Sequence, residues 1–160
     1  NLENLKSSVN EGLLTEKEAK EKERRRVAII EKVAEACQMD LPDLLVEEEI
    51  KKMVHELSHT IERNGLALEN YLAHIKKSAD DLHKEFKAEA EKRVRAALIM
   101  REIARREQIK ISDEELDSKT QEILRTVSPE EQKKIDIADL KIYANGILRN
   151  EKVFQLLESY

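Results

Sequence analysis

The chain of 160 residues has few of the residues that break or cross-link a polypeptide. It contains three glycines, two prolines, one cysteine and no tryptophan. A β-sandwich or barrel needs turn residues every 8–12 positions or so, and this composition cannot supply them. A Rossmann or P-loop fold needs a glycine-rich turn beside a phosphate, and the sequence has none. The composition therefore excludes these folds, and one cysteine provides no disulfide framework.

Long hydrophobic runs and an excess of basic residues are also absent. No apolar run approaches the roughly 18 residues of a membrane span. We also expect no signal peptide before the first helical segment. The net charge is −5, with both signs interleaved along the chain. A nucleic-acid-binding domain would carry a basic face instead. We therefore expect neither nucleic acid nor membrane as a partner, and no motif calls for a cofactor.

What the chain does contain is typical of long helices. Ala, Glu, Lys, Leu and Arg make up more than half of it, and 39% of the residues are charged, against about 25% in an ordinary soluble domain. The first 38 residues are predicted to form one long helix. Residues 15–26 of this helix have Ala19 as their single apolar residue, and a helix that is polar all round bridges through solvent between packed ends. We therefore interpret Arg24–Arg26 as a solvated face.

Helix start and stop signals divide the rest of the chain. Pro42 ends the first helix, and Gly65 suits the left-handed position after the second. Ser112 and Ser128 each begin a capping box, the pattern of Ser followed three residues later by Glu that marks a helix start. Ser78 with Asp81 resembles the same device. Helices are thus predicted near residues 42–64, 68–75, 78–106, 112–127 and 136–159, with a turn at Pro129.

One segment resembles a catalytic motif. His55-Glu56-Leu57-Ser58-His59 forms the pattern H-E-x-x-H, which in zinc metalloproteases puts two imidazoles on one helical face and leaves the Glu as general base. At about 100° per residue, however, the apolar stripe of this helix centres opposite His55 and His59, so both should face solvent. His74 or His83 could be nominated as a third ligand, without independent support. The sequence favours two surface histidines, and no metal or catalytic residue is predicted.

The order of these segments resembles a known family. Five segments are similar to the C-terminal, SurA-like domain of bacterial trigger factor, a ribosome-associated chaperone. They are the run Asp40 to Ile50, the segment Gly65 to Leu72, residues 89–107, residues 109–116, and Leu148 to Val153 with Leu156 and Leu157. The resemblance implies one all-α, elongated multi-helix domain over residues 1–160. It would consist of a long bridging helix (1–38), a first arm and body (42–107), and a second arm with a return helix (112–159).

The resemblance also implies a function. An ATP-independent holdase would cradle unfolded or nascent polypeptides between helical arms, because apolar stripes on thin arms cannot all be buried in one compact core. The family's prolyl isomerase and ribosome-docking domains do not fall within these residues, so we expect no enzyme activity and no direct ribosome contact. A cytoplasmic location is expected, and the oligomeric state stays open, with a homodimer as one alternative. The candidate client-binding residues are Met53, Leu57, Ile61, Leu72, Ile75, Leu124, Val127, Ile135, Leu140 and Tyr143.

Two other functions stay open at this point. A helical scaffold or coiled-coil module would bind one fixed partner, and it would favour an unbroken heptad pattern. Pro42, Gly65 and Pro129 interrupt any such pattern. A zinc metalloprotease built on residues 55–59 is the third hypothesis, and it would require stoichiometric metal.

Overall fold

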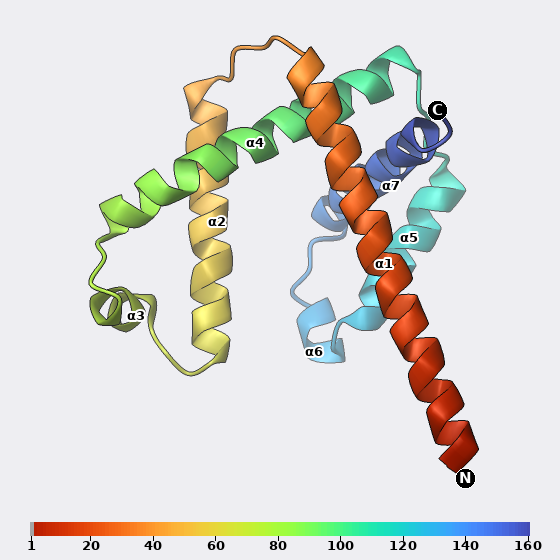
Figure 1. The fold of residues 1–160 in the computed structure, drawn as a ribbon, viewed down its shortest axis with the longest axis horizontal. Coiled ribbons are helices and arrows are strands. Elements are labelled where there is room, and N and C mark those ends of the chain that lie inside the picture. The colour runs from red at the N-terminus through yellow and green to blue at the C-terminus, as the bar shows by residue number, and fades with distance from the viewer. Residues whose placement is uncertain (1) are drawn as a thin grey trace. The chain divides into compact units, whose positions relative to one another are not determined.

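The computed structural model describes the backbone of residues 2–160 and the side chains of residues 6–160. Every regular element in residues 2–160 is a helix, which confirms the predicted all-α class (Figure 1). Asn1, the first residue of the predicted long helix, lies outside the described residues. The helices are α1 (Leu2–Ala36), α2 (Asp43–Arg63), α3 (Leu68–His74), α4 (Ala79–Arg106), α5 (Asp113–Thr126), α6 (Pro129–Gln132) and α7 (Ile137–Leu157).

The helix starts follow the predicted capping signals. The hydroxyl of Ser112 accepts a hydrogen bond from the backbone N–H of Glu115, whose carboxylate accepts one from the N–H of Ser112. Ser128 caps α6 in the same reciprocal way. At the start of α4, the N–H of Ser78 donates to Asp81 over 2.9 Å, and the N–H of Asp81 donates to the Ser78 hydroxyl. These reciprocal bonds satisfy donors that a helix N-terminus otherwise leaves free.

Three helices, α2, α3 and α4, each end in a left-handed turn of the same type. The second residue after the end of the helix has a positive φ in each case: 79° at Gly65, 56° at Lys76 and 51° at Gln108. The N–H that follows then reaches back to a carbonyl in the last turn, as Ile109 does to Ala104 over 2.9 Å. Glycine adopts this conformation without steric cost, whereas lysine and glutamine do not. Only the turn at Gly65 was predictable from the sequence.

The helices group into two compact units, with α1 and α4 contributing to both. The terminal unit comprises residues up to 32 together with residues 100–160, and the central unit comprises residues 33–99. The predicted long helix is confirmed, since α1 runs without interruption through Gly12. The elongated outline, the two arms and the division into one domain with three parts stay predictions.

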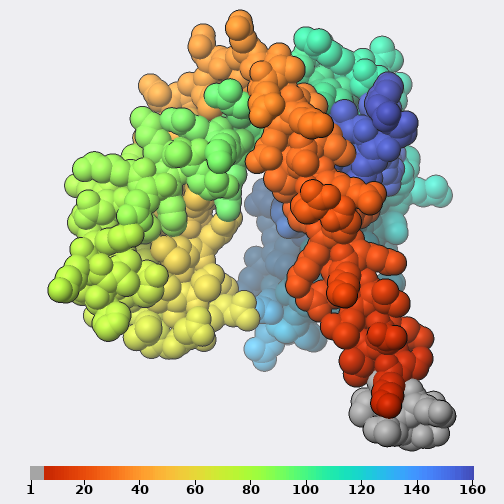
Figure 2. All heavy atoms as spheres, in the orientation of Figure 1, coloured from red at the N-terminus to blue at the C-terminus, as the bar shows by residue number. Residues whose placement is uncertain are grey.

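The core of the central unit lies between α2 and α4. Ile50 and Met53 on α2 are buried against Ala90 and Val94 on α4, together with Val46. Figure 2 shows the atoms of these two helices, in yellow and green, closed against each other where the helices cross. The short helix α3 packs against α2. The guanidinium of Arg93 on α4 lies between Glu49 and Glu56 of α2, at 3.5 and 3.3 Å, and so adds polar contacts across the same pair of helices.

The core of the terminal unit joins the end of α4 to α7. Met100 and Ala104 are buried against Val153, and Ile30 of α1 and Phe154 pack at the edge of this cluster. Helix α5 lies alongside α7, as Figure 1 shows. Two ion pairs tie these helices together. They are Lys152 with Glu115 at 2.8 Å and Lys141 with Asp117 at 2.7 Å.

Arg26 corrects the expectation of a solvated arginine face. Its side chain is only 12% exposed and forms a bidentate pair with Glu151, with both N–O distances at 2.7 Å. Its Nε donates to Glu158 over 2.8 Å, and its guanidinium carbon lies 4.7 Å from the ring centre of Phe154. The hydrogen bonds from Arg26 lower the pKa of Glu151 to about 2. Arg24, by contrast, pairs only with Glu21 on its own helix and stays exposed. The polar stretch of α1 therefore packs on α7 through Arg26.

Candidate polypeptide-binding surface

The H-E-x-x-H segment does not form a metal centre in this structure. His55, Glu56 and His59 are exposed on α2, as the stripe geometry predicted. His83, one of the nominated third ligands, is instead paired with Glu47 of α2, with 2.7 Å between Nε2 and Oε2. Within the described part of the chain, no three His, Cys, Asp or Glu side chains converge on a point that could hold a metal ion. The two histidines are surface residues.

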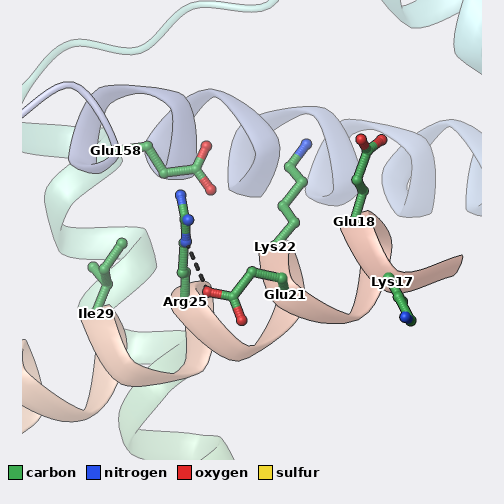
Figure 3. Close-up of a pocket in the computed structure, with 7 residues that line it drawn as sticks. All are labelled: Lys17, Glu18, Glu21, Lys22, Arg25, Ile29 and Glu158. Atoms are coloured by element: carbon green, nitrogen blue, oxygen red, sulfur yellow. Dashed lines mark hydrogen bonds and ion pairs between the residues drawn. The ribbon is translucent and has the colours of Figure 1, made fainter. Parts of the chain in front are cut away.

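A hollow of about 590 Å³ lies beside α1 in the terminal unit (Figure 3). Six of its lining residues come from α1, and the seventh, Glu158, directly follows α7. The set is almost entirely charged: Lys17, Glu18, Glu21, Lys22 and Arg25 line it with Ile29. Three of these charged residues take part in ion pairs, since Arg25 donates to Glu21 over 3.0 Å and Lys22 donates to Glu151 over 3.3 Å. Such a lining offers little to an apolar polypeptide.

The candidate residues in the central unit lie in or near its core. Met53, Ile61 and Leu72 are buried. Leu57 and Ile75 are half-buried. A buried side chain can contact a client only after its own helix pair opens. Met53, Ile61 and Leu72 are therefore closed to a client in this structure, and client binding by the five residues stays a prediction.

The candidates in the terminal unit surround the tip formed by α5, α6 and the start of α7. Leu140 is buried. Leu124, Val127 and Ile135 are half-buried, and the Gln132 side-chain amide secures this tip by donating to the carbonyls of Leu124 and Val127 at 2.8 and 2.9 Å. Tyr143 alone among the ten candidates is fully on the surface, at 61% exposed.

Two further apolar residues accompany Tyr143 on α7, and the sequence reasoning missed them as surface residues. Ile137 is 48% exposed and Ile142 is 71% exposed. Ile137 lies three residues before the buried Leu140, on the side of the buried stripe, and is exposed at the start of the helix. We therefore call only Ile142 and Tyr143 the α7 patch. The buried stripe of α7 contains Leu140 and Ala144, and Ile142 lies two residues from each, which turns it to the other side of the helix. An apolar residue off the buried stripe is the signal that could have identified it.

The same signal identifies two other exposed apolar groups. Leu44 at the start of α2 is 71% exposed and lies two residues before the buried Val46. Its neighbour Leu45 is also exposed. In the first half of α1, Val9, Leu13 and Leu14 are exposed. Exposed apolar residues thus occur in both units, outside the cores.

The comparison with protein families accounts for almost the whole chain. Residues 1–158 match the family described as the C-terminus of bacterial trigger factor protein. The chain belongs to this family. The predicted resemblance is confirmed, and because the C-terminal family covers residues 1–158, these residues contain no prolyl isomerase domain. In residues 2–160, no helix combines the length and apolar character needed to cross a bilayer.

Curated trigger factors from several bacteria are similar to this chain. The Clostridium botulinum trigger factor is 33% identical over 98% of the chain and 37% of its own length. The Halothermothrix orenii protein is 32% identical over 78% of the chain and 29% of its length. The Caldicellulosiruptor saccharolyticus protein is 27% identical over 99% of the chain and 37% of its length. The chain thus spans about a third of these relatives. No solved structure gives a significant match.

Proposed function

We propose that this trigger factor C-terminal region acts as an ATP-independent holdase that binds unfolded or nascent polypeptides through exposed apolar side chains. The observation that carries the proposal is the α7 patch. Ile142 and Tyr143 are 71% and 61% exposed, although both units bury enough apolar residues to have cores of their own. Apolar residues grouped on the surface of a strongly charged chain are typical of an interaction site.

The size of the patch sets the mode of binding. Complete burial of an isoleucine is worth roughly 1.5–3 kcal/mol, so the exposed fraction of Ile142 supplies about 1–2 kcal/mol. Tyr143 adds about 2 kcal/mol. A micromolar complex needs about 8 kcal/mol after the costs of association are met. The α7 patch alone is therefore too small, and a client must contact several exposed groups at once.

Leu44 with Leu45, and Val9 with Leu13 and Leu14, are the other exposed groups that one client chain could engage. A long unfolded polypeptide that touches two or three weak sites gains avidity without any single strong contact. Clients with several separated apolar segments should therefore bind more tightly than short peptides that carry one such segment.

The test is suppression of aggregation of several unrelated unfolded proteins by the isolated chain, with and without ATP. We expect protection of all clients, no effect of ATP, and little change in client affinity between low and moderate salt, because burial of apolar surface drives binding. The variant Ile142→Ser with Tyr143→Ser should lose much of the protection. Lys92→Ser with Glu89→Ser, two exposed polar positions on α4, is the matched surface control.

The scaffold hypothesis predicts a different result in the same assay. A module with one fixed partner protects none of the unrelated clients, and its affinity for that partner does not depend on the α7 patch. Protection of only one client of the set would favour the scaffold and contradict the holdase.

The remaining parts of the proposal concern the cellular setting. Because the chain corresponds to about a third of its relatives, we propose that contact with the ribosome is made by a domain outside these residues. We also propose a cytoplasmic location, where a chaperone of nascent polypeptides would meet its clients. A homodimer stays a prediction, and sedimentation of the purified chain tests it.

A further inference from the structure

The paired histidines of α2 are a motif that the proposed function does not use. His55 and His59 are four residues apart on one helix, and both side chains are exposed. Residues at this spacing lie about 40° apart around a helix, with roughly 5–6 Å between their Cβ atoms. Two imidazole nitrogens can therefore reach the same point from one helical face, which is how histidines at this spacing bind a metal ion.

Helix α2 holds the two histidines on a fixed platform. The side of the helix away from them is packed, since Ile50, Met53 and Ile61 are buried. A ligand pair on a packed helix is preorganised, whereas in the unfolded chain the same two imidazoles move independently. A metal ion that binds this pair should therefore bind the folded protein more tightly than the unfolded protein and raise its melting temperature.

The two carboxylates beside the pair are engaged by other side chains. The carboxylate of Glu56 lies 3.3 Å from Nη1 of Arg93 on α4, and that of Glu62 accepts a hydrogen bond from the Ser58 hydroxyl over 2.9 Å. In a metalloprotease, Glu56 would act as the general base beside the metal. Its ion pair with Arg93 turns it toward α4 instead. The arrangement therefore favours binding of a metal ion over hydrolysis.

We propose that His55 and His59 form a binding site for one divalent transition-metal ion, with water in the remaining coordination positions. The site has only two protein ligands, which agrees with the finding that no three His, Cys, Asp or Glu side chains of the described residues converge. Neutral imidazole suits Cu²⁺, Ni²⁺ and Zn²⁺, whereas Mg²⁺ and Ca²⁺ prefer oxygen ligands. Affinity should be highest for Cu²⁺. The inference is independent of client binding, because it concerns α2 and not the α7 patch.

The test is calorimetric titration of the purified chain, free of any affinity tag, with Ni²⁺. We expect a single ion per chain, no binding of Mg²⁺, and a higher melting temperature when Ni²⁺ is present. Loss of outer partners of a metal site alone costs roughly 10–100-fold in affinity, so loss of a ligand in His59→Gln should cost at least about 10-fold. The exposed His74 of α3 provides the matched control, and His74→Gln should bind Ni²⁺ as the wild type does.

An exchange of two neighbouring residues tests the spacing itself. His59→Thr with Thr60→His keeps the composition and the number of histidines, and both positions are exposed. The histidines are then about 140° apart around the helix and no longer share a face, so this variant should lose Ni²⁺ binding as His59→Gln does. Wild-type affinity in either variant would overturn the site, as would a wild type that binds no Ni²⁺. Equal losses in His59→Gln and His74→Gln would show scattered binding to single histidines and would also contradict the proposal.

Discussion

Replacement of Arg26 by alanine should destabilise the terminal unit far more than replacement of any neighbouring arginine. Arg26 is 12% exposed, and its partners Glu151 and Glu158 are 38% and 31% exposed. Surface ion pairs contribute up to about 1 kcal/mol, whereas removing one partner of a buried pair costs roughly 3–5 kcal/mol. The Arg26 cluster lies between these limits, at about 2 kcal/mol for the two carboxylates.

The contact with Phe154 adds to this value. A guanidinium over an aromatic ring contributes roughly 0.5–1 kcal/mol when partly exposed, which brings the expected loss to about 2.5–3 kcal/mol. In a protein of this size 1 kcal/mol corresponds to roughly 2–4 °C, so Arg26→Ala should lower the melting temperature by about 5–12 °C. The melting temperature of Arg26→Lys should lie between those of the wild type and Arg26→Ala, because lysine keeps the charge and loses the bidentate geometry.

Differential scanning calorimetry of the wild type, Arg26→Ala and Arg26→Lys provides the measurement, with Arg24→Ala as the matched control. Arg24 donates both of its side-chain hydrogen bonds within the described residues to Glu21 of the same helix, so its removal should leave the melting temperature unchanged. Equal melting temperatures for Arg26→Ala and Arg24→Ala would refute the reasoning, because α1 would then be held on α7 by apolar contacts alone.

The remaining predictions concern pH, backbone conformation and the tip. Because the folded pKa of Glu151 is about 2, below its ordinary 4.5, its contribution to stability is complete above pH 4.5 and is lost between pH 4.5 and 2. Urea unfolding across this range should show a shallower pH dependence in Arg26→Ala than in the wild type. Gly65→Ala should lower the free energy of unfolding by about 1 kcal/mol, and Lys76→Gly should raise it by a similar amount, because both positions have a positive φ. A loss of stability in Lys76→Gly would contradict this expectation. Leu124→Ser with Val127→Ser should cost about 1–3 kcal/mol because both side chains are half-buried, whereas Ile142→Ser should stay within about 0.5 kcal/mol; the reverse order would show that the tip is the open surface.

Local signals made most of the helices predictable from the sequence. The capping boxes at Ser112 and Ser128 and the glycine at position 65 are read within four residues of each helix end, so no tertiary information is needed. The left-handed turns at Lys76 and Gln108 were not predictable. Backbone bonds of the folded helix ends impose that conformation on residues that do not favour it.

The parts of the site that depend on distant contacts could not be predicted. The partners of Arg26 are 125 and 132 residues away in the sequence, and a run of arginines beside acidic residues looks solvated when its own helix is considered alone. Amphipathic periodicity indicates which residues could be buried and not which stripes find a partner. Met53 and Leu140 were therefore taken as surface candidates although the structure buries them, and Ile142 was overlooked.

The most direct test of client binding through exposed apolar residues is methyl NMR of the chain labelled at isoleucine, titrated with an unfolded client. The account predicts that the methyl signals of Ile137 and Ile142 shift or broaden, while those of Ile50 and Ile99, which are buried in the structure, do not. Equal changes at all four isoleucines would mean that binding opens the cores. Changes at Ile50 and Ile99 alone, with Ile142 unaffected, would contradict the proposed surface.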